Sequence, residues 1–310
     1  GRAWRTLAVP RPPLSGNRVK ALAVSAGGNL WAATEAGVQQ VAAASESAAG
    51  GNSAAAPLLF DAANSGISPL GVQTLQRGAD DGIWVGGRQG AAFYDGEEWQ
   101  AINVADGLAG ESVQAITVDG EGRTWLGGDR GVSIWNGSSF FVIDARQGLP
   151  SEDIRALAAE AGERGGVWIG TAVGGLYRFE GSQLQLFNAR NVGLPSDTVT
   201  ALAVGNDGAL WIGTDRGLAQ LAGGAVRVID AVGEDPIAAL GVTAAGDVWA
   251  ARATGGVVFG RDDRWTELGV ADGLPSTRIT AIATDGERVW LGGQDGGIAA
   301  FAVNEFLQTD

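Results

Sequence analysis

The chain has 310 residues, of which 45% are hydrophobic and 18% charged, and its 21 basic and 35 acidic side chains give a formal net charge of −14. This length and apolar fraction are enough to bury a large core and exclude a disordered chain. The acidic balance repels phosphate backbones and no basic patch is visible, so we expect no nucleic-acid partner.

Cysteine and histidine are both missing from the sequence. The lack of cysteine excludes disulfide bonds and thiolate metal sites, and we expect neither a metal ion nor a cofactor. Without either residue type the common proton-transfer and nucleophilic mechanisms have no side chain to use near neutral pH, so the chain is predicted not to be an enzyme. Chemistry by two carboxylates stays open, although the sequence singles out no pair.

The N-terminal segment has the pattern of an outer strand, because residues 4–9 (WRTLAV) resemble residues 265–270 (WTELGV). The chain begins at Gly1 without a signal peptide, and no stretch approaches the roughly 18 apolar residues of a spanning helix. We therefore expect membrane attachment only through segments outside this chain.

A repeat runs through the whole sequence and predicts the architecture. Each unit contains Val/Ile-x-Ala-Leu/Ile-Ala, an Asp/Gly turn, Trp-Ile-Gly-Thr and a Gly-Leu-x-x-aromatic stretch, and one tryptophan marks each unit: Trp31, Trp84, Trp125, Trp168, Trp211, Trp249 and Trp290. A period of about 40 residues with four short strands per unit is typical of β-propellers. We predict an all-β, seven-bladed β-propeller of four-stranded antiparallel blades, a single domain over residues 1–310.

The first repeat interval is the longest, since residues 42–57 are rich in Ser, Ala, Gly and Asn. This composition predicts a flexible surface insertion within blade 1. At the other end of the chain, we expect the N-terminal strand to complete the last blade and close the ring, because a toroid does not leave a sheet edge open. Residues 306–310 compete for that place.

The clearest unit shows how a blade is built. Its predicted strands are residues 199–204, 209–214, 217–221 and 226–229, here called strands A to D, and they form an antiparallel meander. Small residues suit the crowded axis and aromatic residues the wider rim, so we place five alanines in inner strands, Ala21, Ala115, Ala156, Ala201 and Ala281, and four aromatic residues in outer ones, Trp99, Phe140, Phe187 and Trp265.

Two prominent residue classes have structural explanations. A tryptophan at the same point of every unit fits a core between blades better than a platform for stacking sugars.

The acidic residues Asp119, Asp207 and Asp285 lie beside glycine between strands A and B, and both residue types are favoured in turns. The segment from Ile116 to Trp125 also has the form of an Asp-box turn, and none of these loops has the ligand series of an EF-hand calcium site.

A family resemblance follows from three copies of Gly-Leu-Pro-Ser, beginning at Gly148, Gly193 and Gly273, each followed by the inner-strand pattern and Trp-Ile/Leu-Gly-Thr/Gly. These units resemble the two-component regulator propeller repeat, although blades 1, 2 and 6 depart from it. The resemblance implies an extracytoplasmic sensor module of a bacterial signalling system, with carbohydrate recognised by some members. Streptogramin lyases have a similar outline, but the general base proposed for them is a histidine.

We place the ligand-binding site at the face where the B–C turns and the D–A connections converge on the central axis. Guanidinium groups there can clamp carboxylates or hydrogen-bond sugar hydroxyls. The candidate residues, from these turns and from the starts of the inner strands, are Arg18, Lys20, Arg88, Gln114, Asp129, Arg130, Arg155, Asp215, Arg216, Arg252, Arg278 and Asp295.

Three functions remain open. The first is a non-catalytic ligand-sensing or glycan-sensing propeller, periplasmic or at the cell surface, with several arginines converging at the axis. The second is a scaffold for a protein partner, which predicts a broad exposed apolar patch on one rim. The third is a carboxylate-based hydrolase or lyase, which predicts two carboxylates at catalytic separation.

Overall fold

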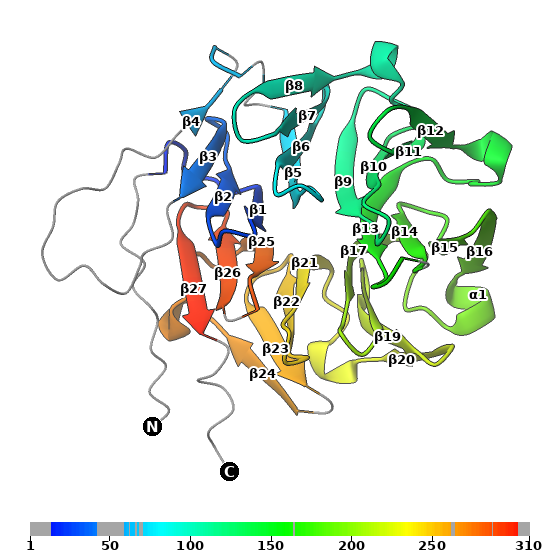
Figure 1. The fold of residues 1–310 in the computed structure, drawn as a ribbon. Helices are drawn as coiled ribbons and strands as arrows, with labels where there is room; N and C mark the ends of the chain where they lie inside the picture. Colours follow the sequence, from blue (N-terminus) through cyan, green and yellow to red (C-terminus); the bar gives the residue numbers. More distant parts are fainter. Residues whose placement is uncertain are drawn as a thin grey trace, which may run out of the picture.

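The computed structural model describes residues 14–41, 59–61, 63–65, 67, 71–163, 165–261, 264–286 and 288–302. These residues form seven antiparallel sheets arranged as blades around a central axis (Figure 1). Six blades have four strands, and the seventh has three within the described part of the chain. The prediction of a seven-bladed β-propeller is confirmed, whereas the N-terminal strand, the insertion at residues 42–57 and residues 306–310 lie outside the described residues.

The innermost strand of each blade is strand A: β1 (Ala21–Val24), β5 (Val72–Arg77), β9 (Val113–Val118), β13 (Ile154–Ala159), β17 (Val199–Val204), β21 (Ile237–Val242) and β25 (Ile279–Thr284). Each packs against the strand A of the next blade, and β25 packs against β1. The inner strands therefore form a closed ring around the axis, and Figure 1 shows them gathered at the centre.

The second strand, B, carries the marker tryptophan: β2 (Leu30–Ala33), β6 (Ile83–Gly87), β10 (Thr124–Gly128), β14 (Val167–Thr171), β18 (Leu210–Thr214), β22 (Val248–Arg252) and β26 (Arg288–Gly293). Strand C follows: β3 (Val38–Val41), β7 (Gly90–Tyr94), β11 (Gly131–Trp135), β15 (Leu176–Glu180), β19 (Gly217–Ala222), β23 (Val257–Arg261) and β27 (Ile298–Ala302).

Strand D lies outermost, on the rim: β4 (Leu59–Phe60), β8 (Trp99–Ile102), β12 (Phe140–Ile143), β16 (Gln183–Phe187), β20 (Ala225–Val228) and β24 (Arg264–Leu268). Five of the D–A connections contain one short helical turn: η1 (Val104–Asp106), η2 (Ala145–Gln147), α1 (Ala189–Val192), η3 (Asp230–Val232) and η4 (Val270–Asp272). The predicted aromatic residues of the outer strands all lie in strand D.

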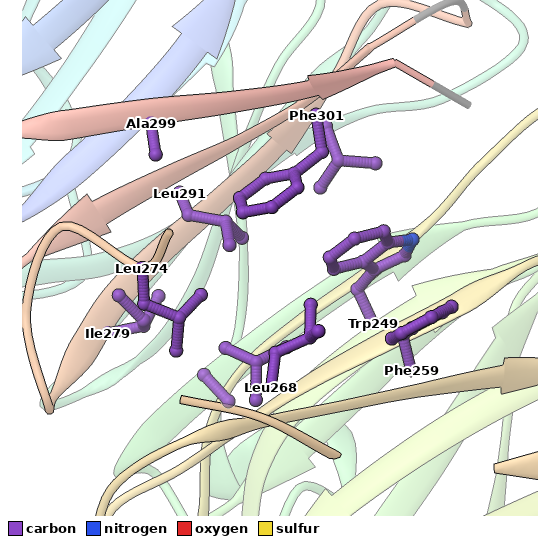
Figure 2. Close-up of a cluster of buried hydrophobic side chains, with 11 residues drawn as sticks. Trp249, Phe259, Leu268, Leu274, Ile279, Leu291, Ala299 and Phe301 are labelled. Atoms are coloured by element: carbon purple, nitrogen blue, oxygen red, sulfur yellow. The ribbon is translucent and has the colours of Figure 1, made fainter. Parts of the chain in front are cut away.

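The core lies between neighbouring blades. Figure 2 shows one such cluster, in which Trp249 and Phe259 of blade 6 face Leu291 and Phe301 of blade 7. Trp249 stacks on Phe259 with ring centroids 4.8 Å apart, and all seven marker tryptophans are buried. The tryptophans therefore fill the space between blades, as the sequence predicts, and offer no platform for sugars.

The glycine of the Trp-Ile-Gly-Thr motif lets two blades approach closely. A Cβ atom on Gly170 would lie 2.5 Å from a methyl group of Val199, the first residue of the next inner strand, and one on Gly292 would lie 2.4 Å from Val19. Such contacts are well below van der Waals distance, so the motif requires glycine in these blades for packing rather than for backbone conformation.

An apolar residue in each D–A connection seals the same interface. It lies five positions before the first residue of the inner strand pattern, and the seven residues are Leu14, Ile67, Leu108, Leu149, Leu194, Val232 and Leu274. Six of them are buried, and Leu14 is partly buried against the same core. The blades that lack Gly-Leu-Pro-Ser thus keep the leucine-like side chain that the motif supplies, and this part of the repeat serves packing.

Candidate functional site

The B–C turns and the starts of the inner strands lie together on one face, here called the B–C face. Backbone hydrogen bonds hold them in place: Arg88 N donates to Gly71 O at 2.9 Å, Asp215 N to Thr198 O at 3.2 Å and Gln294 N to Arg278 O at 2.9 Å. The geometry assumed for the candidate site, in which turns and strand starts share a face, is therefore correct.

A β-bulge at the start of the inner strand repeats around this face. In blade 5 Val199 pairs with Thr214 and Ala201 with Gly213, so Thr200 between them has no partner in strand B. The bulge sends Val199 towards the core shared with blade 4 and Ala201 towards the core shared with blade 6. The side chain of Thr200 therefore lies on the axial side of the strand; it is half-buried, and its hydroxyl oxygen is shielded from solvent.

The same register shift occurs in blades 2 to 7, and in blade 1 the equivalent residue lies just before β1. Seven residues, one from each blade, are thereby placed around the axis: Lys20, Gln73, Gln114, Arg155, Thr200, Ala238 and Thr280. We call them the axial ring. Four of the seven, Lys20, Gln73, Gln114 and Arg155, have charged or amide groups that can contact a polar ligand entering along the axis from the B–C face. The Thr280 hydroxyl donates instead to the carbonyl oxygen of Val19, and the Thr200 hydroxyl is buried.

Polar contacts order part of the axial ring across blades 2 to 4. Ser112 Oγ lies 3.1 Å from Gln73 Oε1, Gln114 Nε2 donates to Asp153 Oδ1 at 3.3 Å, and Arg155 pairs with Asp153 at 2.7 Å. Asp129, in the B–C turn of blade 3, accepts from the backbone N–H of Ser112 at 3.2 Å. The carboxylate of Asp153 therefore serves two axial side chains.

Positive charge gathers where blades 1 and 2 meet. Burial lowers the pKa of the Lys20 ammonium, and the nearby guanidinium groups of Arg18 and Arg88 lower it further, while the carboxylate of Glu35 opposes the shift. Burial alone would raise the pKa of Glu35, but backbone N–H groups and the charge of Lys20 together lower it. Two of those groups, on Asn17 and Arg18, donate to its two oxygens at 2.8 and 2.9 Å. The Lys20 ammonium therefore has two guanidinium groups and one carboxylate in its neighbourhood.

The remaining candidate residues are less closely grouped. Arg130, Asp215, Arg216 and Arg278 are exposed on turns or strand starts, and within the described part of the chain none of their side chains forms an ion pair. Asp295 accepts a hydrogen bond from Ser276 Oγ at 3.0 Å. These residues lie at the margin of the B–C face, and their side chains do not form one cluster.

Arg252 is misplaced in the sequence analysis. It pairs with Ile237 at the end of β22, one position before the turn, so its side chain turns into the blade rather than out of it. There it pairs with Glu267 and lies 3.7 Å from Asp235, with only 15% of the side chain exposed. Two carboxylates hold this guanidinium.

The opposite face carries the A–B turns, where acidic residues have a structural role. Asp119 Oδ2 accepts from Trp125 Nε1 and from Arg123 Nε, both at 2.7 Å. In blade 4, Glu160 accepts from Trp168 Nε1 at 2.8 Å and pairs with Arg178 at 2.7 Å. The guanidinium carbon of Arg178 lies 5.6 Å from the Trp168 ring centroid. These acids hydrogen-bond the marker tryptophans, a role that the sequence did not predict.

The described part of the chain holds neither a cluster of metal-ligating side chains nor a membrane-spanning helix. No three His, Cys, Asp or Glu side chains of the described residues come together in a group that could hold a metal ion. Within the same residues no helix is long and apolar enough to cross a membrane.

The sequence also matches a known repeat. Residues 193–216 match the family model described as two component regulator propeller, and they span the D–A connection, β17 and β18 of blade 5. No curated protein sequence is significantly similar to the chain.

Solved structures with the same fold come from proteins of several kinds. The extracellular domain of a protein described as a hybrid two component system from B. thetaiotaomicron is 19% identical with a TM-score of 0.70, over 93% of this chain and 40% of that one. PorZ, described as a surface component of the type-IX secretion system of Porphyromonas gingivalis, is 15% identical with a TM-score of 0.64, over 94% of this chain and 48% of that one.

A lyase also shares the fold. Catalytically inactive virginiamycin B lyase from Staphylococcus aureus, solved with quinupristin, is 13% identical with a TM-score of 0.75, over 97% of this chain and 99% of that one. At these identities the likeness concerns the fold. The chain spans about 40% of the length of the extracellular domain described above. Residues 193–216 thus carry a two-component regulator propeller repeat, set in a seven-bladed β-propeller.

Proposed function

We propose that the chain is a non-catalytic, ligand-binding propeller of an extracytoplasmic bacterial signalling system, and that its ligand, a small molecule or a glycan, binds on the B–C face at the axis. The observation that carries the proposal is the axial ring, in which Lys20, Gln73, Gln114 and Arg155 of four successive blades present charged or amide groups near the axis. A propeller that served only as a spacer would have no need of four such side chains at this point.

Two further features support a sensor. The repeat in blade 5 and the fold are those of the two-component regulator propellers described above. The positive charge at blades 1 and 2, within a chain of net charge −14, gives the face a local field opposite to that of the molecule. Such a field favours an acidic ligand or an acidic sugar.

A lyase function has less support, although a lyase has the same fold. The inactive lyase variant carries an alanine in place of a histidine, and this chain contains no histidine at any position. Of the carboxylates near the axis, Asp153 is neutralised by Arg155 and bonded by Gln114. A carboxylate that already serves two partners is a poor acid or nucleophile.

The test is a thermal-shift screen of the purified chain against oligosaccharides and small carboxylates, because a ligand that binds only the folded state raises Tm. We expect at least one reproducible shift that is lost in Arg155→Gln and in Gln114→Leu, both in the axial ring. Arg227→Gln, on the outer strand β20, is the matched control and should keep the shift. A shift that survives both axial variants would place the ligand elsewhere and refute the axial site.

A protein-interaction scaffold is the second candidate, and one observation favours it. Phe141, Leu186 and Val228 are exposed at 59%, 38% and 44%, and they lie on the outer strands of three successive blades, β12, β16 and β20. If no compound in the panel shifts Tm, a partner captured by the chain should be lost with Phe141→Ser and kept with Arg155→Gln. That pattern would support the scaffold over the sensor.

A further inference from the structure

A pocket lies at the end of blade 2, next to the B–C turn that carries Arg88. Its volume is about 120 Å³. The apolar lining residues Ile67, Val72, Val85 and Ala92 belong to the core cluster shared by blades 1 and 2, whereas Ala91 and Ile102 belong to the cluster shared by blades 2 and 3. The other lining residues are Gly71, Gly87, Arg88, Gln89, Gly90, Ala91, Ala101, Ile102 and Asn103.

Three alanines of blade 2 line the pocket: Ala92 and its cross-strand partner Ala101 on one face of the sheet, and Ala91 on the other. Ala91 pairs with Gly86, Ala92 with Val85, and Ala101 with Ala92. The residues with the same pairing in blade 3 are Val132, Ser133 and Val142, and in blade 4 they are Leu176, Tyr177 and Leu186. Larger side chains fill this space in those two blades, so the alanines of blade 2 leave it open.

Bare backbone forms the rest of the wall. A Cβ atom on Gly87 would lie 2.7 Å from the carbonyl oxygen of Gly71, and one on Gly90 would lie 2.3 Å from that of Ile102. Glycine at both positions therefore allows the B–C turn that carries Arg88 to pack closely against the backbone of Gly71 and Ile102. A pocket with an apolar floor and one cationic group at its rim can take a molecule with the same two parts.

The charges near the rim decide the sign of the ligand. Within the described residues Arg88 forms no ion pair, and it lies close enough to Lys20 to lower the pKa of that ammonium. Glu35 is the acid of this group, and its oxygens already accept from the backbone of Asn17 and Arg18. The rim is cationic, and a guanidinium can bind a carboxylate with two parallel hydrogen bonds.

We propose that this pocket binds a small organic acid, with the carboxylate on Arg88 and the carbon chain on the alanine-lined floor. This inference rests on the proposed ligand-binding function and names both a second site and the class of ligand. A carboxylate with a short chain has the apolar part that the floor requires, whereas inorganic phosphate presents oxygen on every side. The pocket volume limits the ligand to a short carbon chain, since sites for drug-sized molecules begin at about 300 Å³.

The first experiment is isothermal titration of the whole chain with butyrate, butyramide and inorganic phosphate. We expect butyrate to bind and both other compounds to bind at least about tenfold more weakly, since one of them lacks the charge and the other the carbon chain. Equal binding of butyrate and phosphate would show a general anion effect and overturn the proposal.

Variants locate the ligand. Arg88→Gln should weaken butyrate by about tenfold or more, and Ala101→Val, which introduces the residue of blade 3, should also weaken it by filling the pocket. Arg227→Gln, on the outer strand β20, is the matched control and should bind as the unchanged chain does. Because Arg88 and Ala101 are exposed, Tm without ligand should be unchanged in their variants, which separates lost binding from lost folding.

The outcomes also distinguish this inference from the proposed function. If butyrate binding is lost in Arg155→Gln but kept in Arg88→Gln, the acid binds at the axis, which overturns the pocket and retains the sensor. If no acid binds while an oligosaccharide still raises Tm through the axial ring, the pocket proposal fails alone. Binding that requires both Arg88 and the open alanine floor supports it.

Discussion

The side chain of Asp119 connects the A–B turn of blade 3 to the core between blades 3 and 4. Its carboxylate accepts from the backbone N–H groups of Glu121 and Arg123 at 3.0 and 2.9 Å, besides the bonds to Trp125 Nε1 and Arg123 Nε. Only 2% of the side chain is exposed. Four donors therefore depend on one residue, and losing it would leave the indole N–H of a buried tryptophan without a partner.

We expect Asp119→Ala to lower the free energy of unfolding by about 3 kcal/mol, the cost of breaking a buried charged pair. Asp207→Ala is the control, because Asp207 has the equivalent turn in blade 5, is exposed and accepts only from Ala209 N. We expect that change to cost less than about 1 kcal/mol. Urea unfolding followed by tryptophan fluorescence measures both, and equal losses would contradict a special role for Asp119.

Glu160 gives the molecule a pH-dependent contribution to stability. Hydrogen bonds from Arg178 lower the pKa of Glu160, helped by the backbone of Gly166, the charge of Arg178 and the indole of Trp168, while burial opposes them. Because the folded pKa lies below the ordinary value of 4.5, the stabilisation is present above that pH and is lost as the pH falls through the folded pKa. The pH window thus begins near 4.5 and extends downwards.

We expect Glu160→Gln to be less stable than the unchanged chain at pH 7 and to lose less stability between pH 5 and about pH 3, because its amide does not titrate. Urea midpoints measured across that range test the prediction. Glu97→Gln, in the exposed C–D turn of blade 2, should leave the profile unchanged. If the Glu160→Gln variant loses stability as steeply as the unchanged chain, this carboxylate does not contribute to the acid limb.

At the scale of strands, the close approach of strand B to the next inner strand sets the spacing of the blades. Gly127 and Gly213 repeat the contact of Gly170, with Cβ positions 2.5 and 2.8 Å from Ile154 and Ile237. Blade 6 has Ala251 at the position paired with Ala239, and that alanine is fully buried. The inter-blade distance is therefore not uniform, and each blade has the residue that its own spacing allows.

We expect Gly170→Ala to lower the free energy of unfolding by about 1–3 kcal/mol, because the new methyl group overpacks the core against Val199. The double variant Gly170→Ala/Val199→Ala tests the cause, since the smaller residue makes room for the methyl group. Its loss should be smaller than the sum of the two single losses, as measured by urea unfolding. Additive losses would show that the glycine is required for another reason.

The sequence predicted strands and turns well because each depends on a short local pattern. The alternation in residues 199–204, the turn at 205–208 and the tryptophan at 211 each appear as expected, with strand ends shifted by a residue or so. Arg252 was misassigned because one position decides whether a side chain belongs to a strand or to a turn. That position depends on pairing with Ile237, which is a contact between strands and not a property of either one.

At the scale of the whole molecule, the blade count followed from the tryptophans, whereas the site followed only in part. Lys20, Gln114 and Arg155 were predicted and lie in the axial ring, but Thr200, Ala238 and Thr280 were missed. A residue belongs to the axial ring because a β-bulge leaves it unpaired, and a bulge can be identified only when the pairing register of strands A and B is known. The signal in the sequence is the polar residue between the first apolar residue and the alanine of the inner strand pattern.

The pocket in blade 2 was missed for a similar reason. No single one of Ala91, Ala92 and Ala101 indicates a pocket. The pocket is recognised only when these alanines are compared with the larger residues that pair in the same way in other blades. Such a comparison requires the register of strands B, C and D. A repeat sequence can thus predict what its units share much better than what distinguishes one of them, and ligand sites belong to the second kind.

The segment that supplies strand D of blade 7 remains to be identified. Within the described residues β27 is the outermost strand of this blade, whereas each of the other blades has a strand D. We expect residues 4–9 to supply it, since their pattern matches β24 and the residues after it. Leu268, at the end of β24, is 1% exposed, and Leu7 has the same place in the pattern. Leu7→Asp should therefore destabilise the chain as Leu268→Asp does, by about 3 kcal/mol or more, through an unpaired buried charge.

Leu307→Asp is the matched control, because residues 306–310 are the competing segment for the same edge. If the N-terminal strand completes blade 7, this substitution should leave the urea midpoint unchanged while Leu7→Asp lowers it. The reverse result would assign the outer strand of blade 7 to the C-terminal residues. Every blade would then be built from consecutive residues of the chain. Closure by the N-terminal strand instead joins both ends of the chain in one sheet, so that opening the ring requires breaking strand pairing as well as packing.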